Sequence, residues 1–572
     1  MEVFLGKPAA DGIGIGTAFV VPEPVKRAIK QHRVKIEQTV RGWSRFESAV
    51  QSVISSLTQD LEGLSKTDEK DKIQREVFET YILMLEDPVF LKELKDFYET
   101  ELYNIEYSVQ LKSEQYASML RQSGNDYLAE RAQDITDVFG RVLDEMLDIH
   151  PFDINKVPDG SVIFASSLSS SDTIVLSKRK IAGLALSKGG VSSHVVILAR
   201  NYGIPTVVGL EDINKKVHNG ETIIIDGKTA EILISPDKTT IDNYKAKIRE
   251  EFEHKQALKA FLTKPALTKD GTEFKLYANI GTPEEADLAV AEGADGIGLF
   301  RTEFLYMAQN GTNSTTAARS FSEDSQFKAY KYVLETMGDK PVTIRTLDAG
   351  GDKLINSVDI PIVEESNPLM GLRAVRLSLE YPNLLKTQLR ALYRASVYGN
   401  LRIMLPLITS VDQVTSCIKL VDEVKKELTF ENIPFNDKVP LGIMVETAAA
   451  AIISDCLAKV SDFFSLGTND LTQYTLGIDR ENQHVSALYD EFHLGVLRLI
   501  QITITNANEA NIPVSVCGEM AGRQDSIMVL AGMGIRNLSM SPKLISSTKE
   551  LLSRFTTSEL EAISAKRLTN IF

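Results

Sequence analysis

The spacing of apolar residues divides the first half of the chain into two kinds of segment. From about Pro24 to Ile149, apolar residues recur every three or four positions, which predicts a bundle of at least four antiparallel helices. Asp87-Pro88 marks the start of one of them, because proline is favoured at the first helical position. Between Asp153 and Asp237 the pattern changes to short β-branched runs separated by glycines: SVIFA, DTIVL, ETIIID and TAEILI.

A glycine-rich alternating stretch, AADGIGIGTAFVV, precedes the helical block and predicts strands. The helical block therefore interrupts a smaller α/β unit whose first strand lies before it. A polar helical stretch, YKAKIREEFEHKQALKAFL, follows this unit and reads as a linker helix.

Eight short apolar runs alternate with helical segments after about Leu267. They are KLYANI, GIGLF, PVTIRTL, LRIMLPL, VPLGIMV, DFFSLG, IPVSVCG and NLSMS. This alternation predicts a (β/α)₈ TIM barrel, a fold that places its functional residues at the carboxyl ends of the strands. The expected architecture is thus a multidomain α/β protein with four parts: an α/β unit at 1–22 and 150–237, a helical insert at 23–149, a linker helix at 238–264 and a barrel at 265–572.

Charge and composition narrow the class of protein. The 572 residues carry a formal net charge of −15, which argues against general nucleic-acid binding and suits a basic protein partner. We expect no signal peptide, because the start of the sequence lacks a basic segment followed by an apolar core. We expect no membrane span, because no apolar run approaches the required length. The three cysteines lack the spacing of a metal site or a disulfide framework and indicate a reducing, cytoplasmic location.

His194 is the first candidate for chemistry, within GGVSSHVVILAR. The apolar spacing after it predicts a helix, so His194 would lie near a helix N-terminus, where free N–H groups favour a phosphate. A neutral imidazole is also a capable nucleophile. Arg200 offers a guanidinium for phosphate oxygens. A loop histidine with capping serines is an equally good explanation of this motif taken alone.

A second set of candidates lies near the ends of predicted barrel strands. Glu446 and Asp470 are carboxylates suited to a hard cation such as Mg²⁺. Arginines near the same ends suit a small substrate that carries phosphate and carboxylate. Cys517 ends a strand and, with an ordinary pKa of about 8.5, would be mostly protonated and able to donate a proton; a buried core residue is the alternative. The other candidates are Arg301, Arg345, Asp348, Lys353, Asn367, Arg373, Arg376, Asn469 and Arg480.

The motifs resemble a known superfamily over essentially the whole chain. GGVSSHVVILARNYGIPTVVG resembles the phosphohistidine loop shared by Enzyme I of the bacterial sugar phosphotransferase system, phosphoenolpyruvate synthase and pyruvate phosphate dikinase. GADGIGLFRTEFLY, TIRTLDAGGDK, NPLMGLRAVR, IMVETAAA, DFFSLGTNDLTQYTLGIDR and VCGEMAG resemble its phosphoenolpyruvate-binding barrel. The helical insert is similar to the carrier-binding helices of Enzyme I, and the chain has no room for the nucleotide-binding domain of the ATP-using relatives.

The resemblance implies a phosphotransferase that begins sugar transport. His194 would accept the phosphoryl group of phosphoenolpyruvate and pass it to the carrier protein HPr, while Cys517 protonates the enolate to release pyruvate. Glu446 and Asp470 would bind Mg²⁺, and a homodimer formed by the barrel is expected. The residues expected to hold phosphoenolpyruvate are Arg301, Arg345, Asn469 and Arg480, with Arg373 as a weaker candidate.

Some positions depart from the family pattern. Relatives commonly carry an arginine where this chain has Val191, and a Thr-Asp pair where it has Leu186-Ser187. They commonly carry an Ala-His pair where it has Thr80-Tyr81, and a proline where it has Ala448. The departures around His194 motivate one alternative, a slow regulatory phosphotransfer protein. A separate alternative is a phosphoenolpyruvate synthase-like enzyme, which would need a nucleotide.

Overall fold

The computed structural model divides into two compact units, Met1–Phe252 and Glu253–Phe572. The boundary falls inside helix α8 (Lys238–Leu258), the stretch expected to be a linker. The finer division into four parts remains a prediction. The structure describes residues 1–22, 29–62, 69–121, 126–149, 154–168, 170–177, 179–187, 194–210, 213–303, 305, 322–350, 365, 367–480, 482 and 484–569.

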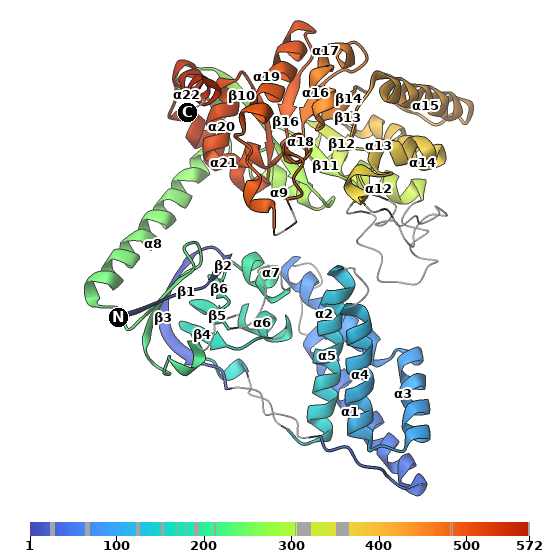
Figure 1. Ribbon diagram of the computed structural model, residues 1–572, viewed down its shortest axis with the longest axis vertical. Coiled ribbons are helices and arrows are strands. Elements are labelled where there is room, and N and C mark those ends of the chain that lie inside the picture. Colours follow the sequence, from blue (N-terminus) through green and yellow to red (C-terminus); the bar gives the residue numbers. More distant parts are fainter. Residues whose placement is uncertain are drawn as a thin grey trace. The chain divides into compact units, whose positions relative to one another are not determined.

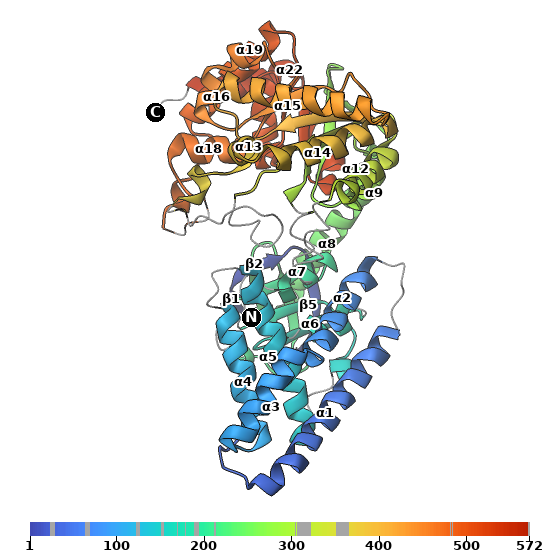
Figure 2. The same cartoon turned by 90° about the vertical axis from the view of Figure 1, so that its right-hand side faces the viewer.

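The helical block of the first unit forms a bundle with its own apolar core (Figures 1 and 2). Asp87 accepts hydrogen bonds from the backbone N–H groups of Val89 and Phe90, so the predicted helix start is confirmed. Tyr81, at the position where relatives commonly carry histidine, is fully buried in this core. The helices are α1 (Ile36–Glu62), α2 (Glu69–Leu85), α3 (Pro88–Glu101), α4 (Ile105–Arg121) and α5 (Asp126–Met146).

The rest of the first unit is built on an eight-stranded sheet with the order β1-β8-β7-β3-β4-β5-β6-β2. Strands β3 and β4 are parallel neighbours, yet the whole helical bundle lies between them in sequence, which confirms that the bundle is an insertion. The strands are β1 (Glu2–Leu5), β2 (Lys7–Ala10), β3 (Ile13–Val20), β4 (Ser161–Ala165), β5 (Gly183–Leu186), β6 (Thr206–Val208), β7 (Thr222–Asp226) and β8 (Glu231–Ile234).

One expected strand is wrong. DTIVL lies in helix α6 (Ser170–Ser177), where Thr173 and Leu176 are buried at helical spacing. The strand propensity of β-branched residues is weak and is overridden when packing favours a helix. The sheet position after β4 is taken instead by GLAL of β5, a fully buried run without β-branched residues.

The second unit is a closed barrel of eight parallel strands, as expected (Figure 1). A short strand, β9 (Ala266–Leu267), pairs antiparallel with the first of them. The barrel strands are β10 (Glu273–Ile280), β11 (Ile297–Arg301), β12 (Pro341–Arg345), β13 (Asn400–Leu405), β14 (Leu441–Val445), β15 (Phe464–Leu466), β16 (Val514–Val516) and β17 (Asn537–Met540).

Helices surround these strands, and the apolar residues between the two layers form the largest core of the molecule. They are α9 (Glu285–Ala291), α12 (Glu323–Met337), α13 (Ala374–Glu380), α14 (Pro382–Ala395), α15 (Val411–Phe430), α16 (Ala448–Ile452), α17 (Ser454–Leu457), α18 (Thr468–Leu476), α19 (Leu494–Glu509), α20 (Gln524–Gly532), α21 (Ile545–Ser553) and α22 (Thr557–Thr569). Among the described residues, none of the helices has the length and apolar character needed to cross a membrane.

Candidate active site

One cavity at the carboxyl ends of the barrel strands brings together most of the residues predicted for the barrel site. Its volume is about 270 Å³. Arg301 and Arg345 are the last residues of β11 and β12, and Glu446 directly follows β14. We call this space the donor cavity. Its lining includes Arg301, Arg345, Arg373, Glu446, Asn469, Asp470, Arg480 and Cys517.

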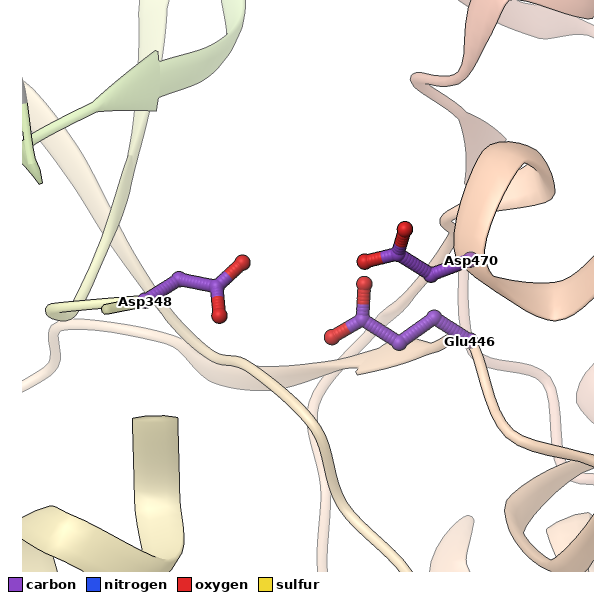
Figure 3. A group of neighbouring side chains, drawn as sticks. All are labelled: Asp348, Glu446 and Asp470. Atoms are coloured by element: carbon purple, nitrogen blue, oxygen red, sulfur yellow. The ribbon is translucent and has the colours of Figure 1, made fainter. Parts of the chain in front are cut away.

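Three carboxylates converge in the donor cavity (Figure 3). One oxygen each from Asp348, Glu446 and Asp470 lie within 4.8 Å of one another, close enough to share a cation. Burial raises the pKa of Glu446, and the negative charges of Asp348 and Asp470 raise it further. A bound divalent cation would remove this repulsion, so the group fits a hard metal ion. A metal-binding role for Asp348 was not predicted from the sequence.

Two arginines hold Asp348 in place. Its Oδ2 lies 2.7 Å from Nη1 of Arg345, and its Oδ1 lies 3.1 Å from Nη2 of Arg373. Burial alone would lower the pKa of the Arg345 guanidinium, but the carboxylates around it raise that pKa above its ordinary value. The Nε atoms of both arginines are buried without a hydrogen-bond partner among the described residues. These donors fit an anionic ligand.

A backbone hydrogen bond from the loop after β13 fixes the carboxylate of Glu446. Its Oε1 accepts a hydrogen bond of 2.6 Å from the backbone N–H of Leu407. Leu407 has a φ of 50°, in the left-handed region that leucine rarely adopts. The loop after β13 therefore turns a backbone donor toward this carboxylate at some conformational cost.

The side-chain amide of Asn469 is already engaged. Its Oδ1 accepts from the backbone N–H of Glu519 at 2.8 Å, and its Nδ2 donates to Oε1 of Glu519 at 3.3 Å. The hydroxyl of Tyr489 donates to the backbone oxygen of Asn469 at 3.2 Å. Asn469 lies in the first turn of α18, where backbone N–H groups lack intrahelical acceptors. Its backbone N–H is thus better placed than its amide to meet an anion. No sequence signal pointed to Tyr489, and Glu519 appeared only as part of the motif VCGEMAG.

Cys517 follows β16 directly and is almost fully buried. Burial raises the pKa of its thiol, and its Sγ donates a long hydrogen bond of 3.7 Å to the backbone oxygen of Leu466. The thiol form is therefore favoured, as a proton donor requires. A larger cavity of about 610 Å³ also reaches Cys517 and Arg301, so the two hollows meet at these residues.

Three of the sequence candidates do not contribute described side chains to the donor cavity. Arg376 donates to the backbone oxygens of Met370 and Gly371, which gives it a structural contact. Asn367 precedes a short 3₁₀ helix and is absent from the described lining. Lys353 lies outside the described residues.

Helix α7 (His194–Asn201) begins at His194, which confirms the predicted position at a helix N-terminus. Val191 and the rest of the preceding loop lie outside the described residues. The side chain of Arg200 contacts the backbone of β2, because its Nη2 donates to the backbone oxygen of Ala9 at 2.7 Å. A phosphate contact of Arg200 would use its remaining N–H donors, because a guanidinium carries five and the contact with Ala9 uses only Nε and Nη2. Ser187, next to the loop, has a buried hydroxyl with no partner in the described part of the chain.

Comparisons with known proteins agree with this architecture. Three family models match the chain: the N-terminal region of PEP-utilising enzymes at residues 5–131, their mobile domain at 157–230 and their PEP-binding domain at 255–557. The chain is 37% identical over 556 residues to the phosphoenolpyruvate-protein phosphotransferase of Priestia megaterium, covering 97% of this chain and 94% of that protein. It is 36% identical over 569 residues to the protein of that name from Bacillus subtilis, covering 100% and 97%. The chain therefore belongs to the family of PEP-utilising enzymes.

Proposed function

We propose that this protein is a phosphoenolpyruvate-protein phosphotransferase: it moves the phosphoryl group of phosphoenolpyruvate to its own His194 and then to a carrier protein, and releases pyruvate. The observation that carries the proposal is the donor cavity, which combines four arginines, four carboxylates, three of which converge, and a buried thiol at one barrel face. Full-length relatives that carry this enzyme name support it. By its family resemblance, the carrier is HPr and the pathway is the sugar phosphotransferase system.

Substrate binding would use the cations of the donor cavity. Arg301, Arg345 and Arg480 would hold the phosphate and carboxylate of phosphoenolpyruvate, with Arg373 and the backbone N–H of Asn469 as further contacts. Glu446 and Asp470 would bind Mg²⁺, and Asp348 is close enough to join them. When bound, this ion would neutralise negative charge on the phosphate oxygens.

In the transfer, a ring nitrogen of His194 forms a bond to phosphorus as the bond from phosphorus to the enol oxygen breaks. The electron pair of that bond stays on the oxygen and gives the enolate of pyruvate. The arginines stabilise the charge that develops on this oxygen. The Cys517 thiol then gives its proton to the methylene carbon of the enolate, which completes pyruvate. The phosphoryl group on His194 is afterwards passed to the carrier.

Assembly and location are also part of the proposal. We place the enzyme in the cytoplasm as a homodimer formed through the barrel. Its three cysteines are all free thiols, which suits a reducing compartment.

Incubation with phosphoenolpyruvate labelled on phosphorus, in the presence of Mg²⁺, tests the function directly. We expect acid-labile label on the wild-type protein and none on His194→Ala. The variant should still bind phosphoenolpyruvate, because the donor cavity is built entirely from the second unit. Acid-labile labelling of His194→Ala would show that the acceptor is a different residue.

A further inference from the structure

A second hollow of the barrel lies at the opposite ends of its strands. Its volume is about 450 Å³. Pro440 directly precedes β14, Phe463 precedes β15 and Pro513 precedes β16, so the hollow opens at the amino ends of the strands. We call it the lower cavity; it shares no lining residue with the donor cavity. In barrel enzymes this face normally serves stability, so charged groups around a hollow here need another explanation.

Two cations line the lower cavity: the exposed Lys438, and Arg402, the third residue of β13. Arg402 is half-buried, and its guanidinium lies against the hydroxyl of Tyr277, a neutral group. It forms no ion pair with any residue that the structure describes. A guanidinium withdrawn from water in this way favours a carboxylate as its partner.

The lower cavity also offers negative charge. Oδ2 of Asp462 accepts a hydrogen bond of 2.7 Å from the backbone N–H of Leu441, and the side chain is exposed at the rim. Within the described ranges, Asp462 has no ion-pair partner. Asp437, also in the lining, is balanced by Lys425, whose Nζ lies 3.0 Å from its Oδ1. The half-buried Arg402 and the exposed Asp462 therefore face the same space without an ion-pair partner among the described residues, and the exposed Lys438 also lines it.

The remaining wall is apolar. Val439 and Phe463 are buried beside Pro440 and Pro513. The ring of Phe463 packs closely over Gly442, where an added Cβ would lie 2.6 Å from ring atoms. The lower cavity thus combines charges of both signs with a rigid apolar surface, a combination typical of sites for small amphipathic molecules.

An apolar layer separates the lower cavity from the donor cavity. Phe463 packs in one cluster with Leu299, Met404, Met444 and Cys517. Leu299, Met444 and Cys517 line the donor cavity, whereas Phe463 lines the lower one. A ligand of the lower cavity is consequently distinct from phosphoenolpyruvate, although it would touch a side chain that packs beside the donor site.

We propose that the lower cavity binds the zwitterion of a free amino acid with an apolar side chain. Its carboxylate pairs with Arg402, its ammonium group pairs with Asp462, and its side chain lies against Phe463 and the prolines. The site is separate from the phosphotransfer chemistry and does not depend on it.

Calorimetric titration of the full-length protein with L-leucine tests the proposal. We expect one leucine bound per chain, and isocaproate and isoamylamine, which each keep one of the two charges, to bind at least about tenfold more weakly. Asp462→Asn should weaken leucine binding by about tenfold or more, since it removes the charge but keeps an oxygen that can accept from Leu441. Arg402→Gln should do the same.

Lys426→Gln is the matched control, because Lys426 is an exposed cation on α15 outside the lining. It should leave leucine binding unchanged, and all variants should retain phosphoenolpyruvate binding. Failure of L-leucine, L-valine and L-methionine to bind the wild-type protein at millimolar concentration would overturn the proposal. Equal affinity for leucine and isocaproate, or unchanged binding in Asp462→Asn, would overturn it as well.

Discussion

Nη1 of Arg345 lies 2.7 Å from Oδ2 of Asp348, and both side chains are nearly inaccessible to solvent, at 8% and 6% exposure. Arg373 contacts the other oxygen of the same carboxylate. Asp348 is therefore fixed between two residues expected to bind substrate, while it also faces Glu446 and Asp470 (Figure 3). Asp348 therefore lies between the arginines expected to bind substrate and the other candidate metal ligands.

Asp348→Asn should raise the Mg²⁺ concentration needed for half-maximal phosphorylation by about 10- to 100-fold, the usual effect of losing a group that orients metal ligands. The change removes one of three converging negative charges and loosens both arginines. The Mg²⁺ requirement is measured from the initial rate of labelled phosphohistidine formation at a series of Mg²⁺ concentrations. Asp339→Asn, an exposed position before β12, is the control. An unchanged Mg²⁺ requirement would leave Asp348 with only a structural role.

The raised pKa of Glu446 predicts a pH dependence. Burial and its carboxylate neighbours favour the protonated form, so a metal ion must displace a proton in order to bind. As pH increases, the proton is lost more easily, and the apparent affinity for Mg²⁺ should increase. Titrations of the metal at several pH values will show this trend in wild-type protein. Glu446→Gln, which has no proton to displace, should bind Mg²⁺ weakly at every pH.

Tyr489→Phe removes one hydrogen bond to the backbone of Asn469. We expect KM for phosphoenolpyruvate to increase by about two- to tenfold, the usual value of a single hydrogen bond, with a smaller change in kcat. Tyr332→Phe is the matched control, since its hydroxyl bonds Asp287 on the outer helices. Equal effects of the two substitutions would argue against a positioning role for Tyr489.

Cys517→Ala should reduce pyruvate formation from phosphoenolpyruvate by at least about 100-fold, because a positioned general acid typically contributes that much. Transfer between phosphorylated carrier and His194 involves no enolate and should proceed normally. In wild-type protein the raised pKa should keep the thiol protonated beyond the ordinary value of about 8.5, so the proton donor persists in mildly alkaline solution. Parallel losses in both half-reactions would indicate that Cys517 serves packing instead.

Periodicity alone predicted much of the architecture. The eight barrel strands were visible because a strand buried on both faces reads as a short apolar run, and the alternating helices fix the barrel topology. The insertion of the helical bundle was also predictable, because the helical spacing begins and ends between two strand-like segments. The helix at DTIVL and the strand at GLAL could not be predicted, because runs this short take the conformation that their tertiary contacts favour.

The sequence determined which residue types stand at the ends of the barrel strands, and therefore which side chains were candidates for binding an anion and a metal. Only the tertiary structure decided how they are paired. It brought Asp348 to Glu446 and Asp470, engaged the amide of Asn469 with Glu519, and directed Arg200 to Ala9. The physical reason is that the positions of the barrel strands follow from local spacing, whereas these contacts join segments far apart in sequence that meet only after the chain folds.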